Sequence, residues 1–88
     1  MEKTMVKTWM DEAGEKIYNL LRQNKIYAQV YLDNEGVVVL IEWGDWKHEH
    51  LYADQLIKAE FPDCQIDQVV TETDGSDCYS AEHHIYGI

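Results

Sequence analysis

The chain has 88 residues and a formal net charge of −10, because 17 Asp and Glu outnumber seven Lys and Arg. This length fits one domain. The 45% hydrophobic content argues against a disordered chain. A surface of this charge repels phosphate backbones and anionic lipids and attracts basic proteins. We therefore expect a single domain over residues 1–88 that binds neither nucleic acid nor membranes directly.

The N-terminal segment lacks the apolar stretch of a signal peptide. The longest uncharged apolar run, Val37 to Ile41, is far too short to span a membrane. These features predict a soluble, cytoplasmic protein, in which both cysteines stay reduced.

Residues 4–24 carry apolar side chains at spacings of three and four, which predicts an amphipathic helix. Thr4 is a suitable N-cap, and Asn24 is a suitable stop. Gly14 lies inside this segment and costs the helix about 1 kcal/mol relative to alanine.

Residues 26–43 alternate as a β-hairpin around a turn that ends in Gly36, where we expect a positive φ. Pairing Leu32 with Val37 makes one face wholly apolar and places Trp43 on that core face. The second strand is apolar on nearly both faces, which favours a central position in the sheet.

Residues 45–61 predict a second helix, with Asp45 as its N-cap and Pro62 ending it. Its apolar face carries one histidine among hydrophobic residues. The members of this stripe are Trp46, His50, Ala53, Ile57 and Phe61.

Residues 65–73 and 78–87 predict a second hairpin, because Asp74-Gly75 is a strong turn signal between them. An in-phase register puts Ile66, Val70 and Ile85 on one face. The order is therefore α-β-β-α-β-β. It predicts an α+β fold with a four-stranded antiparallel sheet and both helices on one face. This order is a circular permutation of the ferredoxin-like arrangement, with the second and fourth strands central.

The four histidines are arranged in two close pairs. His48 and His50 point about 200° apart on a helix, and His83 and His84 face opposite sides of a strand. Chain direction suggests that the two pairs lie at opposite ends of the sheet. We therefore interpret them as ordinary surface histidines.

One weak alternative is a zinc-like site, or an enzyme centre, around Cys64. It would combine this thiol with His83 or His84 and with Asp63 or Asp67, although the spacing matches no known ligand pattern. Buried thiol and surface imidazoles explain the same residues, so we expect no metal.

Cys64 and Cys78 each begin a strand of the second hairpin. They should lie about 25–30 Å apart at the rise of a β-strand. A disulfide needs Cα atoms within about 7 Å, so none is expected between them.

Catalytic motifs are missing from the sequence. Neither serine lies in a nucleophile elbow, and there is no phosphate-binding loop or dinucleotide fingerprint. We therefore predict a protein that is not an enzyme and needs no cofactor.

The remaining signal is the acidity of the second half, which has no Lys or Arg after Lys58. Carboxylates on a rigid domain can imitate the spacing of phosphates and occupy a basic groove on a partner. Small acidic domains of this kind are typical of anti-restriction and anti-CRISPR proteins from phages and mobile elements. We therefore expect a protein-binding domain, an inhibitor or nucleic-acid mimic. The expected contact residues are Glu60, Asp63, Asp67, Glu72, Asp74, Asp77 and Glu82.

The alternative is an accessory or self-assembling domain, such as a homodimer, that uses the sheet face away from the helices. This face combines aromatic, aliphatic and acidic side chains, a composition suited to a protein interface. Its expected contact residues are Tyr27, Tyr31, Leu40 and Tyr86.

Overall fold

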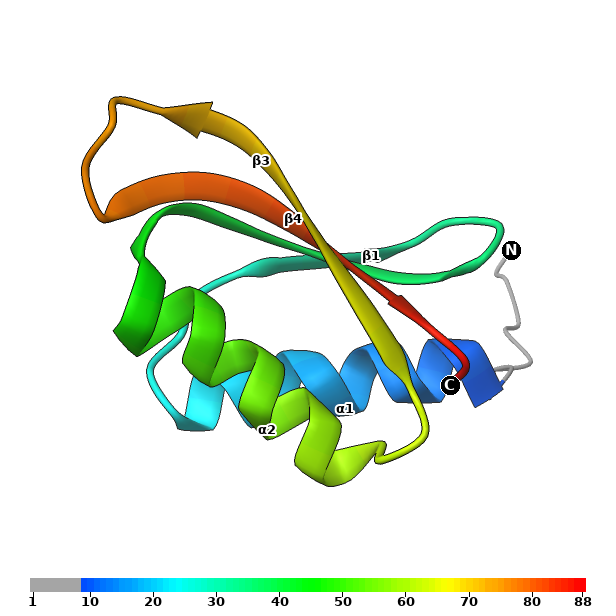
Figure 1. Cartoon of the computed structure of the whole chain (residues 1–88). Coiled ribbons are helices and arrows are strands. Elements are labelled where there is room, and N and C mark those ends of the chain that lie inside the picture. The colour runs from blue at the N-terminus through cyan, green and yellow to red at the C-terminus, as the bar shows by residue number, and fades with distance from the viewer. Residues whose placement is uncertain (1–8) are drawn as a thin grey trace, which may run out of the picture.

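The computed structural model describes residues 9–88, which form an antiparallel sheet with its helices on one face (Figure 1). The elements are α1 (Trp9–Gln23), β1 (Gln29–Leu32), β2 (Gly36–Asp45), η1 (Trp46–Leu51), α2 (Tyr52–Glu60), β3 (Gln65–Thr73) and β4 (Cys78–Tyr86). This order confirms the predicted α+β class. The strands are ordered β1-β2-β4-β3, so the second and fourth strands are central, as the permuted ferredoxin-like arrangement requires.

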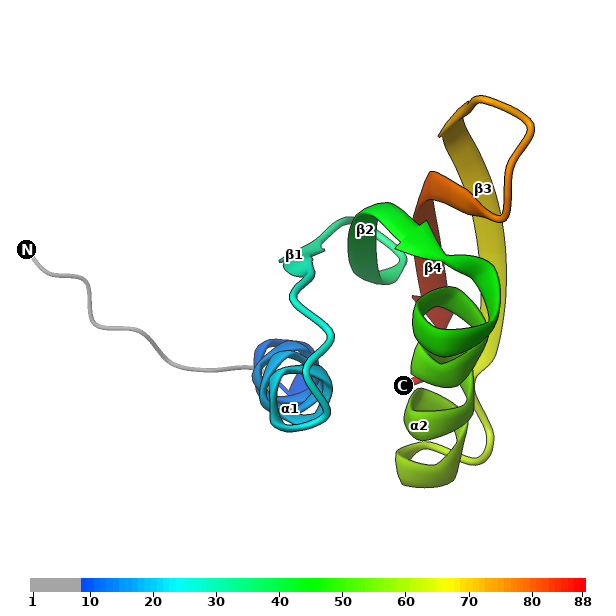
Figure 2. The ribbon, with the colours of Figure 1, turned by 90° about the vertical axis from the view of Figure 1, so that its left-hand side faces the viewer.

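β2 and β3 run parallel to each other, because both pair antiparallel with β4 between them. The connection from β2 to β3 passes through η1 and α2 and forms a split β-α-β unit. Figure 2 shows α1 and α2 below the sheet, while the turn between β3 and β4 projects away from both helices.

α1 packs its apolar stripe against the sheet, with Ile17 and Leu21 fully buried. The predicted N-cap, Thr4, lies outside the described residues. Gly14 faces β1, where a Cβ atom would meet the Leu32 side chain at 3.4 Å. This is an ordinary van der Waals distance, so an alanine side chain would fit at this position.

The β1–β2 turn has the predicted register, with Leu32 opposite Val37. Gly36 does not have the positive φ that we expected. Glycine is required here because the neighbouring strand is close: a Cβ atom at Gly36 would lie 2.0 Å from the carbonyl oxygen of Ile85. The Asp33 carboxylate instead shapes the turn by accepting hydrogen bonds from the backbone N–H groups of Glu35 and Gly36.

A β-bulge in β2 overturns the predicted position of Trp43. The register shifts between Ile41 and Gly44, so β2 contains one extra residue opposite β4. Trp43 takes a left-handed φ of 50°. Its side chain is 48% exposed rather than in the core. The backbone N–H of Trp43 donates to the hydroxyl of Ser80 at 2.9 Å.

The second helical segment begins at the predicted N-cap but with a wider turn than expected, because η1 is a π-helix. Asp45 accepts hydrogen bonds from the N–H groups of Lys47 and His48, which hold the pKa of Asp45 below its usual value. Glu49 in turn accepts from the Asp45 N–H at 2.8 Å. Trp46, predicted on the apolar stripe, is half-exposed at the start of this turn.

In the β3–β4 hairpin Ile66 pairs with Ile85 and Val70 with Ala81, so these residues share one face as predicted. A shift at Thr71 then bends β3. Beyond the helices the hairpin is largely exposed, and Val70 retains 50% of its surface. Cys64 and Cys78, at opposite ends of the hairpin, are both free thiols.

The core lies between the helices and the inner face of the sheet. Its buried members are Ile17, Leu21, Ile26, Val37, Val39, Ile41, Ala53, Ile57, Cys64 and Ile85. Burial of this apolar surface stabilises the fold. Within residues 9–88, neither helical segment is long and apolar enough to cross a membrane.

Candidate functional site

Two polar networks lie on opposite faces of β4, at the adjacent residues His83 and His84. His83 points to the helices and is fully buried. His84 lies on the outer face, where its side chain is 22% exposed. The prediction that these two rings face opposite sides is confirmed, but His83 is not a surface histidine.

The buried histidine chain comprises Asp54, His83, His50 and the carbonyl of Tyr79. His83 Nδ1 lies 2.6 Å from Asp54 Oδ1, and His83 Nε2 lies 2.9 Å from His50 Nδ1. His50 Nε2 lies 2.7 Å from the Tyr79 carbonyl oxygen. The His50 ring also stacks on the Tyr79 ring, with centroids 4.2 Å apart.

The groups at the two ends of the buried histidine chain determine which ring nitrogens carry hydrogens. A carbonyl only accepts, so His50 Nε2–H donates to Tyr79 and His50 Nδ1 accepts from His83 Nε2–H. His83 Nδ1 and Asp54 Oδ1 then share the remaining hydrogen. Burial lowers the pKa of His50, which agrees with a neutral ring at this position.

The expectation that the two histidine pairs lie at opposite ends of the sheet is wrong. Asp45, just before the helix, pairs with Cys78 at the start of β4, so both elements leave from one end. Asp54 is then about 13 Å along the helix, and His83 is about 16 Å along the strand. The different rise per residue brings these two side chains to the same level.

The sequence contained a signal for this chain. His50 occupied the predicted apolar stripe of the second helix, and Asp54 follows it by four residues on the same face. His83 has the same strand parity as the buried residues Ala81 and Ile85. A histidine on the core face needs hydrogen-bond partners, and the Asp54 carboxylate is available on the same face of the helix as His50.

The buried histidine chain presents no free ring nitrogen to a substrate, because each of its four nitrogens faces a partner. Asp54, 23% exposed, is its opening to solvent. This carboxylate borders a depression of about 620 Å³, which is also lined by Lys58, Gln65, Ile66 and Asp67. We therefore interpret the chain as a structural network that fixes His50 and His83 in the core.

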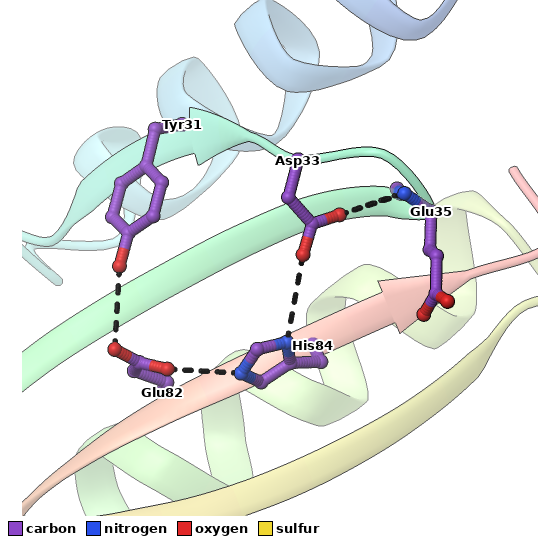
Figure 3. A network of polar contacts seen from close by, with 6 residues as sticks. Tyr31, Asp33, Glu35, Glu82 and His84 are labelled. Carbon is purple, nitrogen blue, oxygen red and sulfur yellow. Dashed lines mark hydrogen bonds and ion pairs between the residues drawn. The ribbon is translucent and has the colours of Figure 1, made fainter.

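The outer-face network surrounds His84 with carboxylates (Figure 3). His84 Nε2 lies 2.9 Å from Glu82 Oε1, and His84 Nδ1 lies 4.0 Å from Asp33 Oδ2. The Tyr31 hydroxyl donates to the other Glu82 oxygen at 3.4 Å. Partial burial and the Glu82 charge raise the pKa of Tyr31.

The predicted aromatic face is only partly assembled. Tyr31, Leu40 and Tyr86 lie on strands of the sheet, but β1 begins at Gln29, so Tyr27 precedes it. The Tyr27 ring is 67% exposed. It lies 5.4 Å from the guanidinium of Arg22 on α1, within the range of a cation–π contact.

Five of the seven predicted acidic contact residues lie on the β3–β4 hairpin and its turn. These are Asp67, Glu72, Asp74, Asp77 and Glu82. The other two lie elsewhere: Glu60 ends α2 and forms a 3.5 Å ion pair with Lys16, and Asp63 lies in the turn before β3. The acids therefore do not all converge on one surface.

Three of the hairpin acids nevertheless lie on one face of the sheet. Asp67 is opposite His84, and Glu72 is opposite Ser80, so both share the outer face with Glu82. The side chain of Ser76 and its backbone N–H, which donates to the Asp74 carboxylate at 3.0 Å, lower the pKa of that carboxyl. Together with Asp74 and Asp77 in the turn, these carboxylates give the hairpin a cluster of formal negative charge.

The residues proposed for a zinc-like site are not assembled. Across residues 9–88, no group of three or more His, Cys, Asp and Glu is placed to hold a metal ion. Cys64 is 1% exposed, and burial raises the pKa of its thiol. It packs as an apolar core residue.

Comparison of the chain with protein-family models, with curated proteins and with solved structures finds no match. Function is therefore argued from the two networks and from the charge of the hairpin. Of these, the hairpin carboxylates are the groups most accessible to a partner.

Proposed function

We propose that this chain is a non-catalytic acidic domain that binds a partner protein with a basic surface through the β3–β4 hairpin. The observation that carries the proposal is the one-sided charge of this segment. Residues 61–88 contain six acidic side chains and no Lys or Arg. Such a field attracts a basic partner and speeds its association.

Exposed apolar side chains beside the acids also support the hairpin as the binding surface. Val69 is half-exposed opposite Glu82 on the outer face of β3, and Trp43 and Trp46 are half-exposed around the end of β2. The Trp46 N–H donates to the carbonyl of Asp77 at 2.8 Å, so this tryptophan adjoins the hairpin turn. Tryptophan and valine beside charge match the composition of interfaces, in which aromatic residues supply much of the binding energy.

The partner class we favour is a cytoplasmic nucleic-acid-binding protein. Carboxylates on a twisted hairpin can take the places of phosphates in its basic groove, which would make this chain an inhibitor. Self-association through the outer face is the second candidate, because the Tyr31 ring is exposed there. Two copies that each carry −10 repel one another, which favours the basic partner.

The test neutralises the hairpin without changing side-chain shape. The hairpin variant combines Asp67→Asn, Glu72→Gln, Asp74→Asn and Asp77→Asn. The control variant combines Glu12→Gln, Glu15→Gln, Glu35→Gln and Glu42→Gln, at exposed positions outside the hairpin. Each variant removes four charges and so changes the net charge from −10 to −6.

Capture from a lysate would be compared for the two variants and the natural chain, at low and high salt. We expect the natural chain and the control variant to capture the same basic nucleic-acid-binding proteins, which high salt releases. The hairpin variant should lose them while keeping its circular dichroism spectrum. Undiminished capture by the hairpin variant would overturn the proposal.

A further inference from the structure

β3 is an edge strand with an unpaired outer side. It has nine residues and pairs with β4 alone, whereas β1 at the opposite edge has only four. Within residues 9–88, no other segment forms a backbone hydrogen bond with the free side of β3. A long exposed edge offers a row of N–H and C=O groups to another extended chain.

The part of this edge that can accept a strand is Gln65–Val70. These residues keep a regular register with β4, which ends at the bulge around Thr71. The depression between α2 and β3 adjoins the same stretch, since Gln65, Ile66 and Asp67 line it. The strand is therefore accessible along its edge and from the helix side at its start.

The negative charge of β3 determines which kind of strand can pair with its free edge. In an added strand, side chains directly opposite each other lie about 5 Å apart, and like charges at this distance are destabilising. A second copy of β3 paired along Gln65–Val70 would bring a second Asp67 to the pairing, with no base in residues 65–73 to balance it. An extended segment with Lys or Arg at alternate positions pairs favourably with the Asp67 carboxylate.

We propose that β3 binds an extended basic peptide segment of a partner as a fifth strand, paired along Gln65–Val70. This inference rests on the proposed function and names how the basic partner is held. Backbone hydrogen bonds supply the affinity, and the carboxylates on the outer face supply the selectivity. Val69, half-exposed on that face, packs against the aliphatic part of the opposing side chains.

The probe is a capped synthetic peptide of alternating lysine and valine, which places its lysines on the face of Asp67. The matched control replaces alternate valines with proline, which keeps the charge but removes the hydrogen-bond donors of a strand. Binding is measured by titration into the full chain. Amide exchange measured by NMR then locates the contact along the sheet.

We expect the alternating peptide to bind and the proline peptide not to bind. Every second amide along Gln65–Val70 should be protected, because alternate N–H groups point to the free edge. Exchange there should slow about tenfold at a free peptide concentration ten times its Kd.

Equal binding of both peptides without protection of β3 would overturn the added strand and leave the basic-partner proposal standing. Failure of both peptides, with successful capture of basic proteins, would overturn the added strand alone. Failure of the capture experiment would instead overturn the proposed function. A second copy of the chain would instead occupy the edge if two results coincide: the β3 amides are protected from exchange without peptide, and the apparent mass of the protein grows with its concentration. These results would overturn the proposal of a basic peptide.

Discussion

The two histidine networks of β4 use the same residue type at adjacent positions, yet only one of them is closed to water. His83 is fully buried and fills both ring nitrogens with partners, whereas His84 keeps access to solvent. A buried polar group that loses its partner has no water to replace it. The comparison teaches that burial, rather than the number of carboxylates nearby, decides how much a histidine contributes to stability.

The sharpest way to break this comparison is to remove each ring in turn. His83→Ala should lower the free energy of unfolding by about 3 kcal/mol, because it leaves a cavity and an unpaired nitrogen on His50. His84→Ala should change it by less than about 0.5 kcal/mol, since water can replace the partners of this partly exposed ring. Urea unfolding followed by circular dichroism measures both. Equal losses would show that the outer-face network matters as much as the buried one.

A smaller effect is expected at the solvent end of the buried histidine chain. Asp54→Ala should cost about 1–3 kcal/mol, because His83 Nδ1 then lacks a partner inside the protein. Asp54→Asn should cost much less, since its amide can donate to this nitrogen and keep all three hydrogen bonds with neutral groups. The same urea titration separates the variants. An asparagine variant as unstable as the alanine variant would mean that the charge of Asp54 is required.

The smallest expected effect is a loss of stability in mild acid. Burial lowers the pKa of His50 in the folded protein. Below about pH 6.5 this histidine therefore binds a proton more readily in the unfolded chain than in the folded one. Stability therefore falls as the pH decreases from about 7.5 to 5.5, above the range in which carboxylates titrate. Glu49, Asp54 and His83 are the titratable groups around this ring.

Thermal unfolding at several pH values tests this dependence, in enough salt to screen the general repulsion of a negative chain. His48→Ala is the control, because its ring lies on the exposed side of the same turn and should leave the slope unchanged. A melting temperature that stays constant or rises on acidification contradicts the assignment of His50 as a buried neutral ring.

Much of the fold could be predicted because its signals are local. Alternation predicts the register of the first hairpin and the shared face of the second, and Asp45 and Asp74-Gly75 mark a helix start and a turn. The errors lie where the backbone leaves regular geometry. Nothing in a hydrophobic pattern announces an extra residue in a strand or a π turn, so Trp43 and Trp46 were assigned to the core.

The candidate site was harder to predict because it depends on distances between elements. The buried histidine chain joins residues 29 and 33 positions apart, through elements that rise at different rates. The charge of the β3–β4 hairpin needed no such geometry, since it follows from the absence of Lys and Arg after Lys58. Composition therefore indicated the exposed surface but not the buried network.

The π turn of η1 also affects how the length of this chain can change. A π turn holds about one residue more than an α turn, so a chain one residue shorter between Asp45 and His50 would close this turn as ordinary α-helix and keep Asp54 and Ile57 facing the sheet. The same deletion inside α2 would instead rotate every later side chain by about 100° against the sheet. The wide turn of η1 is therefore the place in this helical segment where the loss of one residue is compatible with the fold.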